Sequence, residues 1–143
     1  MRSGIYFFSE DISFRPPSLK KARLWLNEVA INENRPIGNL NYIFCSDAYL
    51  LTINRTYLGH DTLTDIITFD NAENGAEIEG DIYISVERVN DNAEKFRTTF
   101  DAELHRVMVH GLLHLVGYKD KTANQKKIMR KKETTYLSLR NFS

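Results

Sequence analysis

Residues 110–120 constrain the fold of this chain more than any other segment. They place His110 and His114 four residues apart in an apolar run of helical periodicity, and Gly117 and Asp120 follow. Because an α-helix rises about 1.5 Å and turns about 100° per residue, the two imidazoles lie on one face, about 6 Å apart along the axis. A glycine favours the left-handed conformation in which many helices end. The segment therefore predicts a buried helix whose exit turns Asp120 back toward the two histidines.

His110, His114 and Asp120 are candidate ligands of one metal ion. Zn²⁺ accepts imidazole nitrogens and carboxylate oxygens, and three protein ligands leave a fourth position open, as in catalytic rather than structural sites. We expect one Zn²⁺ per chain, although the carboxylate would also admit another divalent ion. Two simpler interpretations stay open. In these, the histidines are ordinary buried residues hydrogen-bonded to their neighbours, and Asp120 helps to cap the last helix.

Gly111 lies inside the same predicted helix, where glycine costs about 1 kcal/mol relative to alanine. A side chain at this position would lie next to the metal ion, so we expect the glycine to leave room for substrate. His105 is not a candidate ligand, because its spacing of five residues from His110 places it on another face of the helix.

The composition indicates a soluble globular protein. The chain has 143 residues, of which 42% are hydrophobic and 27% charged, and one cysteine. It is long enough to bury a core, and a single cysteine excludes an intrachain disulfide. No run approaches the roughly 20 apolar residues of a membrane span. We expect one domain over residues 1–143, in a cytoplasmic monomer without membrane association.

The net charge of zero conceals an asymmetry. Residues 1–100 carry 10 Lys and Arg and 15 Asp and Glu, a net charge of −5, whereas residues 101–143 carry 9 and 4, a net charge of +5. Seven of the basic residues lie within residues 119–132. Such a cluster attracts the phosphates of a polyanion. It is also typical of a solvated helix face, and charge alone favours that simpler interpretation.

Helical and strand patterns alternate along the chain without a linker or repeat. We expect strands at residues 4–8, 40–44, 66–69 and 78–86, and helices at about 19–29, 86–97, 100–116 and 123–138. A further helix should carry Leu50, Ile53 and Tyr57 and end near Gly59. Ser18 and either Ser46 or Asp47 are the expected caps of the first two helices. Asn74 and Gly75 predict a hairpin, so the last strand is antiparallel to its predecessor. The order predicts an α+β fold, with a mixed, mostly parallel four-stranded sheet, one antiparallel strand and about five covering helices.

Three motifs, in order, resemble the YbeY family of endoribonucleases. Residues 109–118 look like the histidine segment of that family, residues 64–69 resemble its T-D-V-L-S-F segment, and residues 80–85 resemble its G-D-I-x-I-S segment. The match spans about residues 40–120. The spacing H-x-x-x-H-x-x-G-x-x-D also resembles the metzincin zinc-binding pattern, but Gly111 stands where metalloproteases carry the catalytic glutamate.

The resemblance implies a metal-dependent, single-strand-specific endoribonuclease. In the family, such enzymes mature the 3′ end of small-subunit ribosomal RNA and serve ribosome quality control, so ribosomal RNA precursors and the small ribosomal subunit are the implied partners. Two positions depart from the family pattern. Asp120 stands where the family has a third histidine, and Leu58 stands where it has an arginine thought to act on substrate phosphate. That role then passes to Arg55, Arg106 or a C-terminal lysine.

His60, Asp65 and Arg106 are the candidate catalytic residues. The segment with His60 and Asp65 flanks the cleft in the family, so both are candidate general bases. The simpler interpretations are an exposed loop histidine and a turn-capping carboxylate. Two other functions stay open: a metalloprotease, which Gly111 argues against, and a noncatalytic ribosome-associated factor that binds RNA and uses its metal for structure.

Overall fold

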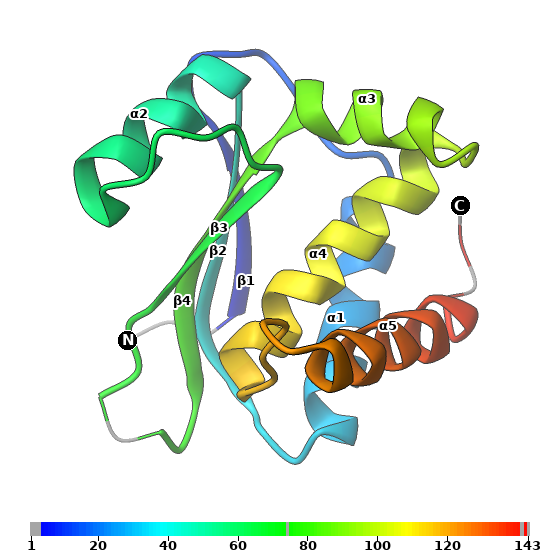
Figure 1. Ribbon diagram of the computed structural model, residues 1–143. Helices are drawn as coiled ribbons and strands as arrows, with labels where there is room; N and C mark the ends of the chain where they lie inside the picture. The colour runs from blue at the N-terminus through cyan, green and yellow to red at the C-terminus, as the bar shows by residue number, and fades with distance from the viewer. Residues whose placement is uncertain (1–3, 74, 141, 143) are drawn as a thin grey trace.

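The chain forms one mixed sheet with helices on both faces (Figure 1). The computed structural model describes residues 4–73, 75–140 and 142. Its elements are β1 (Gly4–Ser9), α1 (Leu19–Asn32), β2 (Ile37–Cys45), α2 (Asp47–Leu58), β3 (Ile66–Asp70), β4 (Ile78–Ser85), α3 (Val86–Lys95), α4 (Phe100–Val116) and α5 (Ala123–Ser138). No helix in these ranges is long and apolar enough to cross a membrane.

The sheet order is β1-β2-β4-β3. β1, β2 and β4 are parallel, and β3 runs antiparallel to β4. The predicted α+β fold is confirmed for the described part of the chain, as are the bounds of α4 and α5. In the predicted hairpin turn, Asn74 lies outside the described residues, and Gly75 has a left-handed φ of 74°.

The two faces of the sheet are covered unequally (Figure 1). α4 packs on β3 and β4, flanked by α1 and α5, and this side holds the larger core. α2 covers the other face over a small cluster of Cys45, Leu50, Ile53 and Ile67. α4 therefore lies between the sheet and α5, which explains why most of its length is buried.

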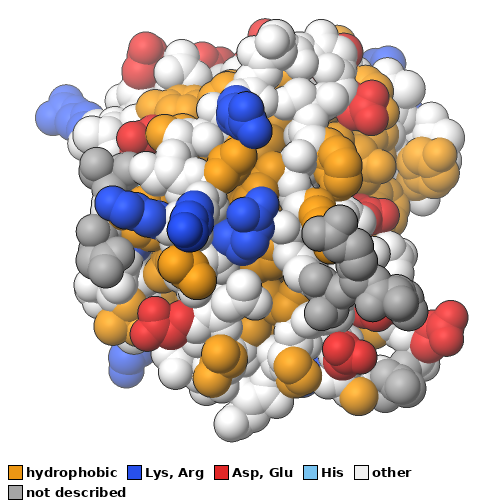
Figure 2. Space-filling view, turned by 180° about the vertical axis from the view of Figure 1, so that it is seen from behind, with side chains coloured by type: hydrophobic (Ala, Val, Ile, Leu, Met, Phe, Trp, Pro, Cys, Tyr) orange, Lys and Arg blue, Asp and Glu red, His pale blue; other side chains and the backbone are white. Residues whose placement is uncertain are grey.

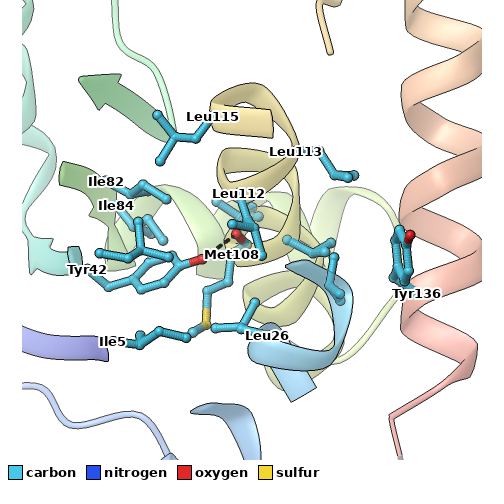
Figure 3. Packing of buried hydrophobic residues seen from close by; sticks show 14 of the residues in the cluster. Ile5, Leu26, Tyr42, Ile82, Ile84, Met108, Leu112, Leu113, Leu115 and Tyr136 are labelled. Atoms are coloured by element: carbon cyan, nitrogen blue, oxygen red, sulfur yellow. Dashed lines mark hydrogen bonds between the residues drawn. The ribbon is translucent and has the colours of Figure 1, made fainter. Parts of the chain in front are cut away.

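A buried hydrogen bond links α4 to the sheet. The side chain of Tyr42, on β2, is fully buried, and its hydroxyl donates to the carbonyl of Met108 in α4 at 2.8 Å (Figure 3). A buried hydroxyl without a partner would be costly, so this bond favours one position of the helix. Leu112 packs on the same side of α4, beside Ile82 and Ile84 of β4 (Figure 3).

Gly111 faces the sheet rather than a substrate, so our expectation for this residue is wrong. A Cβ atom here would lie 2.9 Å from Cδ1 of Ile66 and 3.0 Å from Cδ1 of Ile82. Gly80 on β4 is equally tight, because a Cβ atom there would lie 2.5 Å from the carbonyl oxygen of Phe69 and 2.9 Å from Cδ1 of Leu115. The two glycines allow helix and strands to approach closely.

A side-chain hydroxyl caps the start of each helix in the described part of the chain except α1. The hydroxyls of Ser46, Thr99 and Thr122 accept N–H bonds at the starts of α2, α4 and α5. Thr122 forms a capping box with Gln125, so Asp120 is not the cap of α5. Ser18 occupies the predicted N-cap position of α1, but it has a left-handed φ of 55° and its side chain makes no capping bond.

α5 is anchored to α1 by buried polar contacts. The indole N–H of Trp25 donates to the carbonyl of Tyr136 at 2.8 Å. The carboxylate of Glu33, at the end of α1, accepts hydrogen bonds from the hydroxyls of Tyr136 and Tyr118 and pairs with Lys132 at 3.2 Å. Burial raises the pKa of Glu33, but these bonds outweigh it and hold the pKa below its usual value. The docked carboxyl is therefore ionised at neutral pH.

The Gly80→Ala substitution should lower the free energy of unfolding by about 1–3 kcal/mol, because the new methyl group meets a backbone carbonyl that cannot move freely. Gly38→Ala is the matched control on β2, since the nearest atom there is the flexible end of Glu79, at 2.8 Å. Urea denaturation measures both values. Equal losses in the two variants would contradict the close approach described here.

Candidate metal centre

The two histidines and Asp120 converge as the sequence predicts. The Nε2 atoms of His110 and His114 lie 3.0 Å apart. Oδ2 of Asp120 lies 3.3 Å from Nε2 of His110 and 3.6 Å from Nε2 of His114. Among the described residues, no other group of three such side chains is placed to hold a metal ion. Gly117, with a φ of 131°, ends α4 and lets the chain turn back.

Hydrogen bonds donated by the Nδ1 atoms leave both Nε2 atoms free to act as ligands. Nδ1 of His114 donates to the carbonyl of Tyr118 at 3.0 Å, and Nδ1 of His110 donates to Glu133 at 2.5 Å. Burial and the neighbouring His110 lower the pKa of His114, which favours its neutral form. Two lone pairs and a carboxylate oxygen therefore face one point, an arrangement that a bound cation stabilises.

Glu133 is a candidate functional residue that the sequence analysis missed. Its side chain is only 5% exposed and also pairs with Nη1 of Arg106 at 3.1 Å. Burial raises its pKa, but the bond from His110 and the charge of Arg106 more than offset this, so the pKa lies below its usual value. A carboxylate that holds the Nδ1 proton orients a metal-binding imidazole and makes it a better ligand. The available signal was an acid on the buried stripe of Met129 and Tyr136.

Arg106 is bound mainly to carboxylates. It donates to Glu103 through Nε at 3.0 Å and Nη2 at 2.7 Å, and to Glu133 through Nη1. These bonds raise its pKa, and Glu103 is only 2% exposed. The result is a continuous series of contacts from Glu103 through Arg106 and Glu133 to His110. Arg106 thus helps to position Glu133. The catalytic role of Arg106 stays a prediction.

Only one of the two candidate general bases, Asp65, lies beside the candidate metal ligands. Asp65, just before β3, lines a cavity of about 270 Å³ together with His110 and Asp120. Burial raises the pKa of Asp65, although Arg106, 3.8 Å away, partly offsets this. His60 is exposed in the loop after α2 and does not line this cavity. Geometry favours Asp65, and both roles stay predictions.

Leu58, which replaces the family arginine, and nearby Arg55 lie away from the cavity beside the histidines. Leu58 is exposed, and Arg55 pairs with Asp61 in an exposed contact. Neither lines the cavity beside the histidines, whereas Lys126 and Arg130 of α5 do. Arg106 also lines the cavity but is paired with Glu103 and Glu133. Of the three alternatives for binding substrate phosphate, the geometry favours a C-terminal lysine, Lys126, and the role stays a prediction.

Comparison with known proteins establishes the family. A family model described as Endoribonuclease YbeY matches residues 9–141. The chain belongs to the YbeY family. The protein named Endoribonuclease YbeY from Cytophaga hutchinsonii is 56% identical over 138 residues, which is 96% of each chain. The one from Amoebophilus asiaticus is 51% identical and covers 95% of this chain and 92% of its own.

A solved structure supports the same assignment. The solution structure of a Thermotoga maritima protein is 31% identical to this chain, with a TM-score of 0.66. The match covers 94% of this chain and 87% of that one. The resemblance predicted from three short motifs is therefore confirmed over nearly the whole length, including the β1 and α5 regions that the motifs did not reach.

Metal analysis by mass spectrometry should find one divalent ion per purified chain and none in His114→Ala, because that variant loses a ligand.

In Glu133→Gln, a zinc titration should show about 10–100-fold weaker binding, since the neutral amide no longer offers a negative charge to the Nδ1 proton of His110. Glu94→Gln, on the exposed side of α3, is the matched control and should bind as the wild type does. Wild-type affinity in Glu133→Gln would refute the orienting role.

Proposed function

We propose that the chain is a metal-dependent endoribonuclease that cleaves single-stranded regions of ribosomal RNA precursors in the cytoplasm. The proposed reaction matures the 3′ end of small-subunit ribosomal RNA, with the small ribosomal subunit as partner and a role in ribosome quality control. The observation that carries the proposal is the convergence of His110, His114 and Asp120 at the edge of a cavity with basic side chains. Membership of the YbeY family supports it.

We further propose Zn²⁺ as the resident ion at His110, His114 and Asp120. When bound, such an ion lowers the pKa of water and polarises a phosphoryl oxygen. The donor set fits it, because both imidazoles present a lone pair and the third ligand is an anion. The oxygen ligand leaves manganese or another divalent ion as the alternative.

The chain's own residues then divide the remaining work. Asp65 lies in the cavity with a raised pKa, so we propose that its carboxylate accepts the proton of the attacking water. Glu133 keeps the proton of His110 on Nδ1, and Arg106 keeps Glu133 in place. Gly111 offers no side chain for the glutamate of metalloproteases, and this argues against a protease. The open cavity beside the ligands argues against a purely structural ion.

Removal of the metal by a chelator should abolish cleavage of a single-stranded ribosomal RNA fragment, and added Zn²⁺ should restore it. Gel analysis of the products measures the activity, with casein as a parallel substrate that should stay intact. RNA that stays intact with metal-loaded protein would contradict the proposed function. Hydrolysis of casein that stops with chelator would support the protease instead.

Asp65→Asn should lower kcat for RNA cleavage by about 10²–10⁴-fold, because the amide cannot accept a proton. The metal content of this variant should not change, since Asp65 is not one of the three ligands. His60→Ala, in an exposed loop, is the comparison variant and should retain most of the activity. The reverse result, with His60→Ala inactive and Asp65→Asn active, would exchange the two assignments.

A further inference from the structure

A second cavity continues the first along the groove between α4 and α5. It has a volume of about 370 Å³ and reaches Asn92, Phe96 and Thr98 near the end of α3. Asp65, Arg106 and Arg130 line both cavities. The two spaces are therefore parts of one groove, with the metal ligands at one end and Phe96 at the other.

Two basic residues of α5 face this groove without a protein partner. Lys126 and Arg130 are exposed, and among the described residues their side chains form no hydrogen bond or ion pair. Lys132, by contrast, pairs with Glu33, and Arg106 is bound to carboxylates. Only Lys126 and Arg130 of the seven basic residues in 119–132 line the first cavity.

Charge alone would not select this groove. Lys and Arg side chains also gather among hydrophobic ones on the face seen from behind (Figure 2). What distinguishes Lys126 and Arg130 is that they lie in the same cavity as His110 and Asp120. A phosphate held there would be next to the proposed metal ion.

The far end of the groove offers an aromatic ring to a ligand. Phe96 follows the last residue of α3 and is 58% exposed, as are several other large apolar side chains, but it is the one that lines this cavity. Beside it, the Asn92 amide and the Thr98 hydroxyl form no hydrogen bond with the described residues. An exposed ring beside polar groups without partners is the kind of surface on which a nucleobase stacks.

We propose that this groove is a two-part subsite for single-stranded RNA. Arg130, assisted by Lys126, binds a backbone phosphate, and a nearby nucleobase stacks on Phe96 in the second cavity. The α4 residues that line the groove, 102–110, span about 12 Å. This is a distance within reach of adjoining nucleotides. The inference rests on the proposed function and explains its strand preference, because paired bases cannot leave a duplex to stack on Phe96.

Binding to a fluorescein-labelled single-stranded oligoribonucleotide tests the two parts separately. Stopped-flow anisotropy with the metal-loaded protein reads the affinity before cleavage. Phe96→Ala should bind about tenfold more weakly, with an unchanged salt dependence. Arg130→Ala should also weaken binding, and it should reduce the slope of log K against log salt by about 0.7, because one phosphate contact is lost.

Two matched control variants change residues outside the groove. Ile128→Ala removes an exposed apolar side chain of α5, and Lys131→Ala removes a neighbouring charge, yet neither residue lines the groove. Both should bind RNA as the wild type does. If Lys131→Ala lowers affinity and slope as much as Arg130→Ala, or if Phe96→Ala matches Ile128→Ala, the subsite is wrong.

A cleavage experiment locates the stacked base. RNA substrates with one abasic nucleotide, moved stepwise from the scissile bond, should be cleaved more slowly by the wild type at one position. Phe96→Ala should cleave all of them at similar rates, since there is no ring to lose contact with. If Phe96→Ala still cleaves the RNA more slowly at one abasic position, the proposed stacking on Phe96 is wrong. If the wild type cleaves no RNA, the proposed function fails, and the binding measurements still decide on the subsite.

Discussion

The close packing of α4 on the sheet is the constraint on which the rest of this structure depends. Gly80 and Gly111 remove the two methyl groups that would hold helix and strands apart, and the hydroxyl of Tyr42 binds a carbonyl of the helix. With one side of α4 packed on the sheet, His110 and His114 lie on another side, where His110 contacts Glu133 of α5 and His114 contacts Tyr118. Packing contacts away from the candidate metal site therefore fix the positions of the two histidines.

The polar layer between α4 and α5 carries the second level of organisation. Glu103 and Glu133 are almost fully buried, a costly state for carboxylates that Arg106 and His110 compensate. Because Glu103 binds Arg106, Arg106 binds Glu133 and Glu133 binds His110, several contacts together fix the orientation of the His110 imidazole. The open cavity begins where this layer meets solvent, so the same groups lie between the buried interior and the proposed RNA-binding surface.

Local patterns were sufficient for much of the fold and for the ligands. Helix bounds of α4 and α5, the antiparallel strand and the convergence of His110, His114 and Asp120 all follow from short-range spacing. Local spacing could at most have marked Glu133 as an acid on a buried stripe, because the partner that reveals its role, His110, lies 23 residues earlier on another helix. Gly111 was misread for the same reason. The helical pattern shows that a glycine is present, but only the packing against Ile66 and Ile82 shows which surface requires it.

The anchoring of α5 on α1 has a thermodynamic consequence for metal loading. α5 supplies Glu133, and Tyr118 gives its carbonyl to His114 while its hydroxyl binds Glu33. A ligand that binds only the docked arrangement stabilises that arrangement by linkage. An ion bound at this site would therefore stabilise the docked C-terminal helix, and the docked helix would in turn favour binding of the ion.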